Sequence, residues 1–156
     1  MKRTSIGTLI GVGLFVAAAA AILTARFYGS MLAIPATVSI TLWVMTALCL
    51  GLTWKVRQAK NDDGIGLDRT QLNPLTIAQF MLVAKASAWT GTIVGGAYAG
   101  IACYVVPNAG RLAAAADDLT GVLASALGGV AMAIAGVVLE RYCEVPPPET
   151  GTDALE

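Results

Sequence analysis

Lys85 and Glu140 are the residues of this sequence with the clearest potential for chemistry. Lys85 interrupts the apolar run FMLVAKASAWTG, and Glu140 closes the apolar run that precedes Arg141. Ionisable side chains in or beside a membrane are costly, so they pair with opposite charges, reach the headgroups, or serve substrate and proton pathways. We predict that Lys85 and Glu140 lie at a similar depth at the inner membrane boundary, where they can form an ion pair. The alternatives are Arg141 as the partner of Glu140, and a snorkelling anchor or a substrate or proton role for Lys85.

Residue types needed for other reactions are scarce. The chain has no histidine, which removes the commonest general base and metal ligand. Its 3 cysteines form no CxxC motif and no disulfide framework, and Cys49 and Cys103 lie in apolar runs, where a thiol packs as a small hydrophobe. Ser125 has neither a histidine nor an aspartate at membrane depth to activate it. We therefore expect no catalytic residues, no cofactor and no metal, and a protein that is not an enzyme.

These candidates are embedded in a very apolar chain. Apolar residues make up 56% and charged residues 13%, about half the charged share of an average soluble domain. The apolar runs reach or approach the ~20 residues that cross ~30 Å of hydrocarbon, and they must be helical because backbone groups find no water there. The sequence predicts an all-α polytopic membrane protein, a four-transmembrane-helix bundle of two helical hairpins, with helices at about 5–25, 32–54, 74–106 and 118–142. They form a single domain over residues 1–145, and the Pro-rich polar tail, 146–156, is expected to be disordered.

Basic residues predict how the helices are oriented. They gather before the first helix, between the second and third helices, and after the fourth: Lys2, Arg3, Lys55, Arg57, Lys60, Arg69 and Arg141. The other side holds only Arg26 and Arg111. Because basic residues mark the cytoplasmic side, we predict cytoplasmic N- and C-termini in the cell (inner or plasma) membrane. The MKR start and the AAAAA run resemble a secretory signal, but the first apolar run is longer than a signal core, so we favour an uncleaved helix over a cleaved one.

Small residues at four-residue spacing predict where the helices pack. Helices in lipid associate through close contact, so such patterns mark contact seams. The third and fourth helices are the richest in them, and we expect these two helices to pack closely together; the helix-packing seam consists of Gly91, Gly95, Gly96, Gly100, Gly129 and Gly136. The pattern alone does not distinguish packing within the protein from packing between subunits, and we favour the first. Gly7 and Gly11 form a further pattern in the first helix. Asp117 and Asp118 are expected to cap the outer end of the fourth helix.

The third apolar run is too long for a simple crossing. A helix over Pro74–Val106 would be ~50 Å long, compared with ~30 Å of hydrocarbon. We therefore expect Leu75–Ala84 to form an inner extension of the same helix or an interfacial segment.

Several stretches carry a resemblance to a known family. They are the N-P-L-T opening of the third helix, AKASA around Lys85, G-x-Y-A-G from Gly96 to Gly100, and L-E-R-x-C-x-V-P-P after the fourth helix. With them, nearly the whole chain resembles a family of uncharacterised actinobacterial membrane proteins, the domain of unknown function 3180. Glu144 departs from the basic residue that is frequent there in the family. The resemblance implies a small four-helix inner-membrane protein with no assigned activity and no catalytic residues to carry over.

We favour a non-enzymatic accessory or scaffold subunit of a membrane or cell-envelope complex. Its expected partners are the lipid bilayer and either other membrane proteins or further copies of itself; the zero net charge gives no indication of nucleic acid. The alternative is a small transporter or channel-like protein that moves a metabolite or lipid-like substrate. Lys85 supports it, as does a G-T-x-x-G pattern that starts at both Gly7 and Gly91 and suggests either a duplicated hairpin or chance similarity. The lack of an acidic residue at mid-membrane argues against transport.

Overall fold

The protein is a row of long α-helices. The structure, a computed structural model, describes residues 4–27, 37–61 and 74–143. The helices are α1 (Ile6–Phe27), α2 (Thr37–Asn61), α3 (Pro74–Asn108) and α4 (Ala113–Cys143), and the described residues contain no strand. Each of the 4 helices is long and apolar enough to cross a membrane. The prediction of an all-helical polytopic membrane protein is confirmed. The predicted tail, 146–156, lies outside the described residues.

The start of α4 differs from the prediction. α4 begins at Ala113, so Asp118 lies inside the helix and not at its N-cap. The helix starts early because residues 113–116 are all alanine, the residue with the highest helix propensity. The carbonyl of Leu112 accepts hydrogen bonds from the Ala115 and Ala116 amides, both at 3.1 Å. The expectation that Asp117 and Asp118 cap this helix is therefore wrong.

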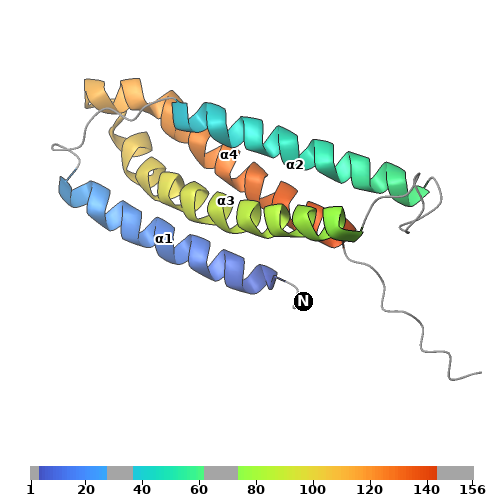
Figure 1. The fold of residues 1–156 in the computed structure, drawn as a ribbon. Helices are drawn as coiled ribbons and strands as arrows, with labels where there is room; N and C mark the ends of the chain where they lie inside the picture. Colours follow the sequence, from blue (N-terminus) through green and yellow to red (C-terminus); the bar gives the residue numbers. More distant parts are fainter. Residues whose placement is uncertain (1–3, 28–36, 62–73, 144–156) are drawn as a thin grey trace, which may run out of the picture.

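The helices follow one another in space in the order α1, α3, α4, α2. α3 packs against α1 on one side and α4 on the other, and α2 packs mainly on α4 (Figure 1). α3 and α4 thus form a packed antiparallel hairpin. By contrast, α1 and α2 are consecutive in the chain but lie at opposite edges of the row, with no helix–helix contact between their described residues. A duplicated hairpin would pack α1 on α2 as α3 packs on α4, so the packing gives no support to the suggested duplication.

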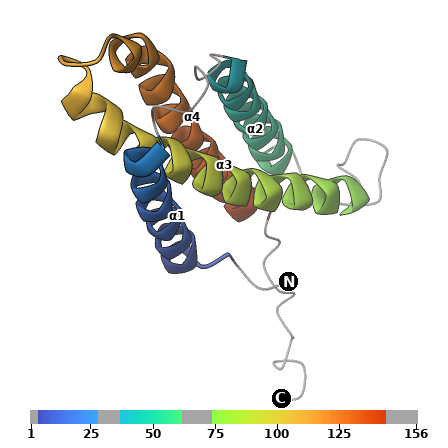
Figure 2. The same cartoon turned by 90° about the vertical axis from the view of Figure 1, so that its left-hand side faces the viewer.

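The length of α3 is accommodated by an oblique course. α3 has 35 residues, or ~52 Å of helix, and it crosses the other helices at an angle (Figure 2). Leu75–Ala84 continues the same helix, which decides between the two predicted alternatives. This segment packs on the ends of α2 and α4 in a buried cluster of Val56, Ile77, Ala84, Leu139 and Cys143. Beyond the cluster, Gly136 lies so close to α3 that a methyl group on it would be 2.6 Å from the Ala88 amide nitrogen.

One face of α3 uses glycines to approach α4. A methyl group on Gly91 would lie 2.6 Å from the backbone nitrogen of Ala133, and one on Gly95 would lie 2.9 Å from the carbonyl carbon of Gly129. Side chains cannot be accommodated at such distances when the obstacle is backbone. The contact between α3 and α4 is therefore backbone against backbone, as expected for helices that associate in lipid.

A second face of α3 uses glycines to approach α1. A methyl group on Gly96 would lie 2.7 Å from the Gly13 carbonyl oxygen, and one on Gly100 would collide with the Ala17 carbonyl oxygen. The six glycines of the predicted seam therefore all touch a neighbouring helix, but they serve two interfaces. Gly11, in contrast, has nothing within 4 Å of the position a methyl group would take. The Gly7–Gly11 pattern thus makes no interhelical seam within the described structure.

Substituting Gly91 tests the backbone contact. We expect Gly91→Ala to lower the free energy of unfolding by ~1–3 kcal/mol, because a methyl group must push α4 away from α3. The measurement is a denaturant titration of the protein in detergent, followed by circular dichroism. Gly121→Ala is the matched control, since a methyl group there meets nothing within 4 Å and gains helix propensity. Equal stability of the two variants would contradict the seam.

Candidate functional site

Lys85, Glu140 and Thr4 meet at one end of the bundle. The Lys85 ammonium nitrogen lies 3.7 Å from the Glu140 carboxylate oxygen Oε1. The same oxygen accepts hydrogen bonds from the Thr4 backbone nitrogen at 3.0 Å and from the Thr4 hydroxyl at 2.9 Å. The structure thus brings together the two residues predicted to pair, and it adds a third that the sequence did not single out. We call these three residues the Glu140 junction.

Each member of the junction is positioned by a different segment. Lys85 lies on α3, Glu140 lies near the end of α4, and Thr4 precedes α1, whose first turn starts with the Leu9 amide bonded to the Ser5 carbonyl at 3.2 Å. The sequence gives no sign that Thr4 bonds to Glu140, because the two residues are 136 positions apart in the chain. A threonine ahead of a helix indicates only a local capping role. Its reach to Glu140 follows from the packing of α1 on α3.

The Glu140 carboxylate is the electrostatic centre of this end of the bundle. Its side chain is 5% exposed, whereas that of Lys85 is 26% exposed. A buried carboxylate needs donors or an opposite charge, and Glu140 has both. Lys85 keeps part of its surface outside the protein, as a snorkelling lysine does. This arrangement joins three segments of the chain through one carboxylate.

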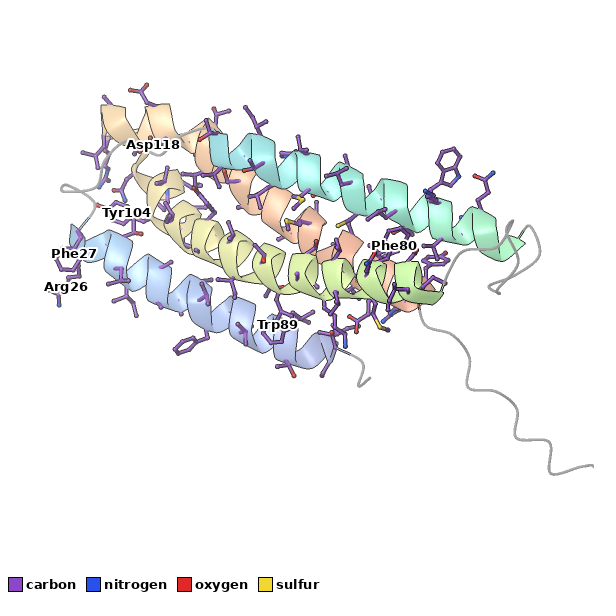
Figure 3. The ribbon with its side chains drawn as sticks, viewed as in Figure 1. Arg26, Phe27, Phe80, Trp89, Tyr104 and Asp118 are labelled. Atoms are coloured by element: carbon purple, nitrogen blue, oxygen red, sulfur yellow. The ribbon has the colours of Figure 1, made fainter. Side chains whose placement is uncertain are left out.

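The opposite end of the bundle carries different residues. Arg26, Phe27, Tyr104 and Asp118 all lie there, while Phe80 lies toward the other end, on the first part of α3 (Figure 3). Trp89 lies between α3 and the first half of α1 in this view.

Polar groups inside the bundle bond mostly within their own helix. The hydroxyls of Thr24, Thr46 and Thr53 donate to the carbonyl four residues earlier, at 2.7–2.8 Å. The buried Cys49 thiol donates to the Ser87 hydroxyl at 3.3 Å and so links α2 to α3. Such bonds satisfy polar groups where no water is available.

Ser125 and the possible metal ligands can be placed in the structure. Ser125 is fully buried, and its hydroxyl has no hydrogen-bond partner in the part of the chain that the structure describes. The same residues contain no group of three or more His, Cys, Asp and Glu side chains that could hold a metal ion.

An apolar groove of about 570 Å³ lies between α1 and α4. Its floor is formed by small residues of α3, including Gly95 and Ala99, and its walls include Leu14 of α1 and Ile134 of α4. Arg141 also lines it, at the end that holds the Glu140 junction. We call this feature the α1–α4 groove. It exists because α1 and α4 both pack on α3 without packing on each other.

These features define a small polytopic membrane protein with backbone-packed helices and a polar junction at one end. The family described as "Protein of unknown function (DUF3180)" matches residues 9–147, and the chain belongs to it. No curated protein and no solved structure matches the chain. The family match covers Lys85 and Glu140 and begins after Thr4.

Paired substitutions test the Glu140 junction. We expect Lys85→Met and Glu140→Gln each to lower the free energy of unfolding by ~1–3 kcal/mol, because each leaves a buried or half-buried polar group without its charged partner. The double variant should cost less than the sum of the two, since it removes both charges together. Denaturant titration in detergent gives the coupling energy, and the exposed Arg26→Gln serves as the control, with a change below ~0.5 kcal/mol. Strictly additive losses would show that the two charges do not interact.

Proposed function

We propose that this protein is a non-enzymatic accessory or scaffold subunit of a complex in the cell membrane. Membrane helices associate through small-residue seams, and a subunit that joins a complex needs such seams on its outer surface. The proposal thus depends on what the outer faces of the two edge helices, α1 and α2, present to their surroundings.

The observation that carries the proposal is a pair of unused seams at the two edges of the row. On α1, Gly11 has no atom within 4 Å of a built methyl group, and on α2 the same is true of Gly51. Gly51 and Ala47 form a small-residue pattern in a shallow apolar depression that Leu48 and Lys55 also line. The glycines of α3 pack against α1 and α4, whereas Gly11 and Gly51 contact no neighbouring helix among the described residues and can pack against helices of another protein.

The apolar character of the interior favours this function over transport of a polar solute. A solute path needs polar groups that replace water, and transporters place such groups near the middle of the membrane. Here the Glu140 junction ties segments together at one end of the bundle, and the α1–α4 groove is lined by apolar side chains apart from Thr92 and Arg141.

The orientation of the chain completes the proposal. Thr4 and Glu140 are hydrogen-bonded, so the start of α1 and the end of α4 lie at the same end of the bundle. That end also carries Arg141, and the basic residues Lys55 and Arg57 occur toward the end of α2. Basic residues favour the cytoplasmic side, which supports cytoplasmic N- and C-termini.

Purification of the tagged protein from its native membrane in a mild detergent tests the accessory role. We expect a membrane protein partner to co-purify and to fall about tenfold in amount with Gly11→Leu or Gly51→Leu, as a loss of ~1.4 kcal/mol in binding would give. A Cβ atom at either position meets no neighbouring helix within 4 Å, so the fold should persist. Gly121→Leu is the control, because its methyl position is also open but lies away from both edges of the row. A protein that purifies alone, or a partner that survives both edge substitutions, would count against the role.

Cysteine labelling tests the orientation. In a variant without the native cysteines, we expect Gly110→Cys, between α3 and α4, to react with a membrane-impermeant maleimide added to intact cells. Ser5→Cys, at the other end of the bundle, should react only after the membrane is opened. The reverse pattern would show that the protein is inserted the other way round.

A further inference from the structure

The α1–α4 groove combines a mostly apolar lining, in which Thr92 is the polar exception, with a positive charge at one end. Along most of its length it is lined by side chains such as Ile10, Leu14, Ile134 and Val138. Arg141 lines the groove at the end nearest the Glu140 junction. An exposed Arg141 is not needed by the junction, since Glu140 already has Lys85 and Thr4 as partners.

The shape of the groove selects a thin, flexible occupant. Its floor is the α3 surface where glycines already hold α1 and α4 close, so α1 and α4 cannot move apart without losing backbone contacts at Gly95 and Gly96. A volume of about 570 Å³ lies within the ~300–1,000 Å³ range of small-molecule sites. A hydrocarbon chain matches this volume and apolar lining, whereas a transmembrane helix with its side chains is ~10 Å wide.

The charge at the end of the groove selects the headgroup. Arginine binds phosphate through two parallel hydrogen bonds and keeps its charge when partly desolvated. The last turn of a membrane-crossing helix places Arg141 at the depth of lipid phosphates. We infer that the α1–α4 groove binds one anionic phospholipid, with an acyl chain lying between α1 and α4 and the headgroup phosphate on Arg141. This site is separate from the edge seams of the proposed function and does not depend on that function.

Native mass spectrometry of the full chain tests the site. The protein is reconstituted in vesicles of equal parts phosphatidylglycerol and phosphatidylethanolamine, extracted gently, and its retained lipids are counted. We expect one phosphatidylglycerol per chain. Arg141→Gln should reduce its preference over phosphatidylethanolamine about fivefold, the ratio that corresponds to ~1 kcal/mol per basic residue at an anionic surface. Ala99→Phe, which fills the groove floor, should abolish retention of either lipid.

Matched controls separate the site from general effects. Ala18→Phe adds the same side chain to an exposed position of α1 that does not line the groove, and it should leave lipid retention unchanged. Arg26→Gln removes an exposed charge at the opposite end of α1 and should also have no effect. Because Arg141→Gln changes only an exposed side chain, it remains informative even if Ala99→Phe fails to fold.

Two results would overturn the inference. The first is equal phosphatidylglycerol retention by the wild type, Arg141→Gln and a folded Ala99→Phe. The second is protein occupancy of the groove: an Ile134→Cys variant that cross-links to another polypeptide, or to a second copy, in place of retaining lipid. Loss of the co-purifying partner in the Gly51→Leu variant, with lipid retention unchanged, is the result expected if both proposals are right, because the edge seam and the groove are distinct surfaces.

Discussion

The close approach of backbones at the glycines of α3 is the constraint on which the rest of the structure depends. In hydrocarbon there is no hydrophobic force to press helices together, so association relies on contacts that weaken steeply with distance. α3 offers glycines on two faces, with Gly91 and Gly95 toward α4 and Gly96 and Gly100 toward α1. It can therefore hold two neighbours at backbone distance. The order of the row follows from this, with α2 added on the far side of α4.

Glycine seams fix how close the helices lie better than they fix their register. A pattern that repeats every four residues offers a similar fit after a shift of one turn, or ~5.4 Å. The Glu140 junction supplies what the seams lack, because a single carboxylate oxygen accepts from Thr4 and lies near Lys85 at one relative height of the helices. It matters most for α1, whose helix contacts are confined to α3. Position and register are thus set by two different kinds of interaction.

The sequence predicted the parts of this arrangement that depend on local composition. Long apolar runs predicted the helices, Pro74 marked the start of α3, and the spacing of Lys85 and Glu140 from the helix ends placed them at a similar depth. It failed where the outcome depends on which helices become neighbours. Gly7–Gly11 and Gly91–Gly95 look alike in sequence, yet only the second pair meets a partner helix, because α1 turns Gly13 toward α3 instead. The role of Thr4 likewise depends on a partner 136 positions away. Asp118 lies inside α4 because the alanines before it are already helical.

The same packing leaves two kinds of apolar surface that differ in shape. At the edges, Gly11 and Gly51 are open positions on exposed helix faces, where another helix can approach to backbone distance. Between α1 and α4 the surface is an apolar groove lined by three helices, which suits a single hydrocarbon chain. A lipid there would fill the space that α1 leaves by packing on α3 alone, and it would bury Leu14 and Ile134 without altering the glycine contacts. The row would then behave as a filled bundle while keeping both edges free for protein partners.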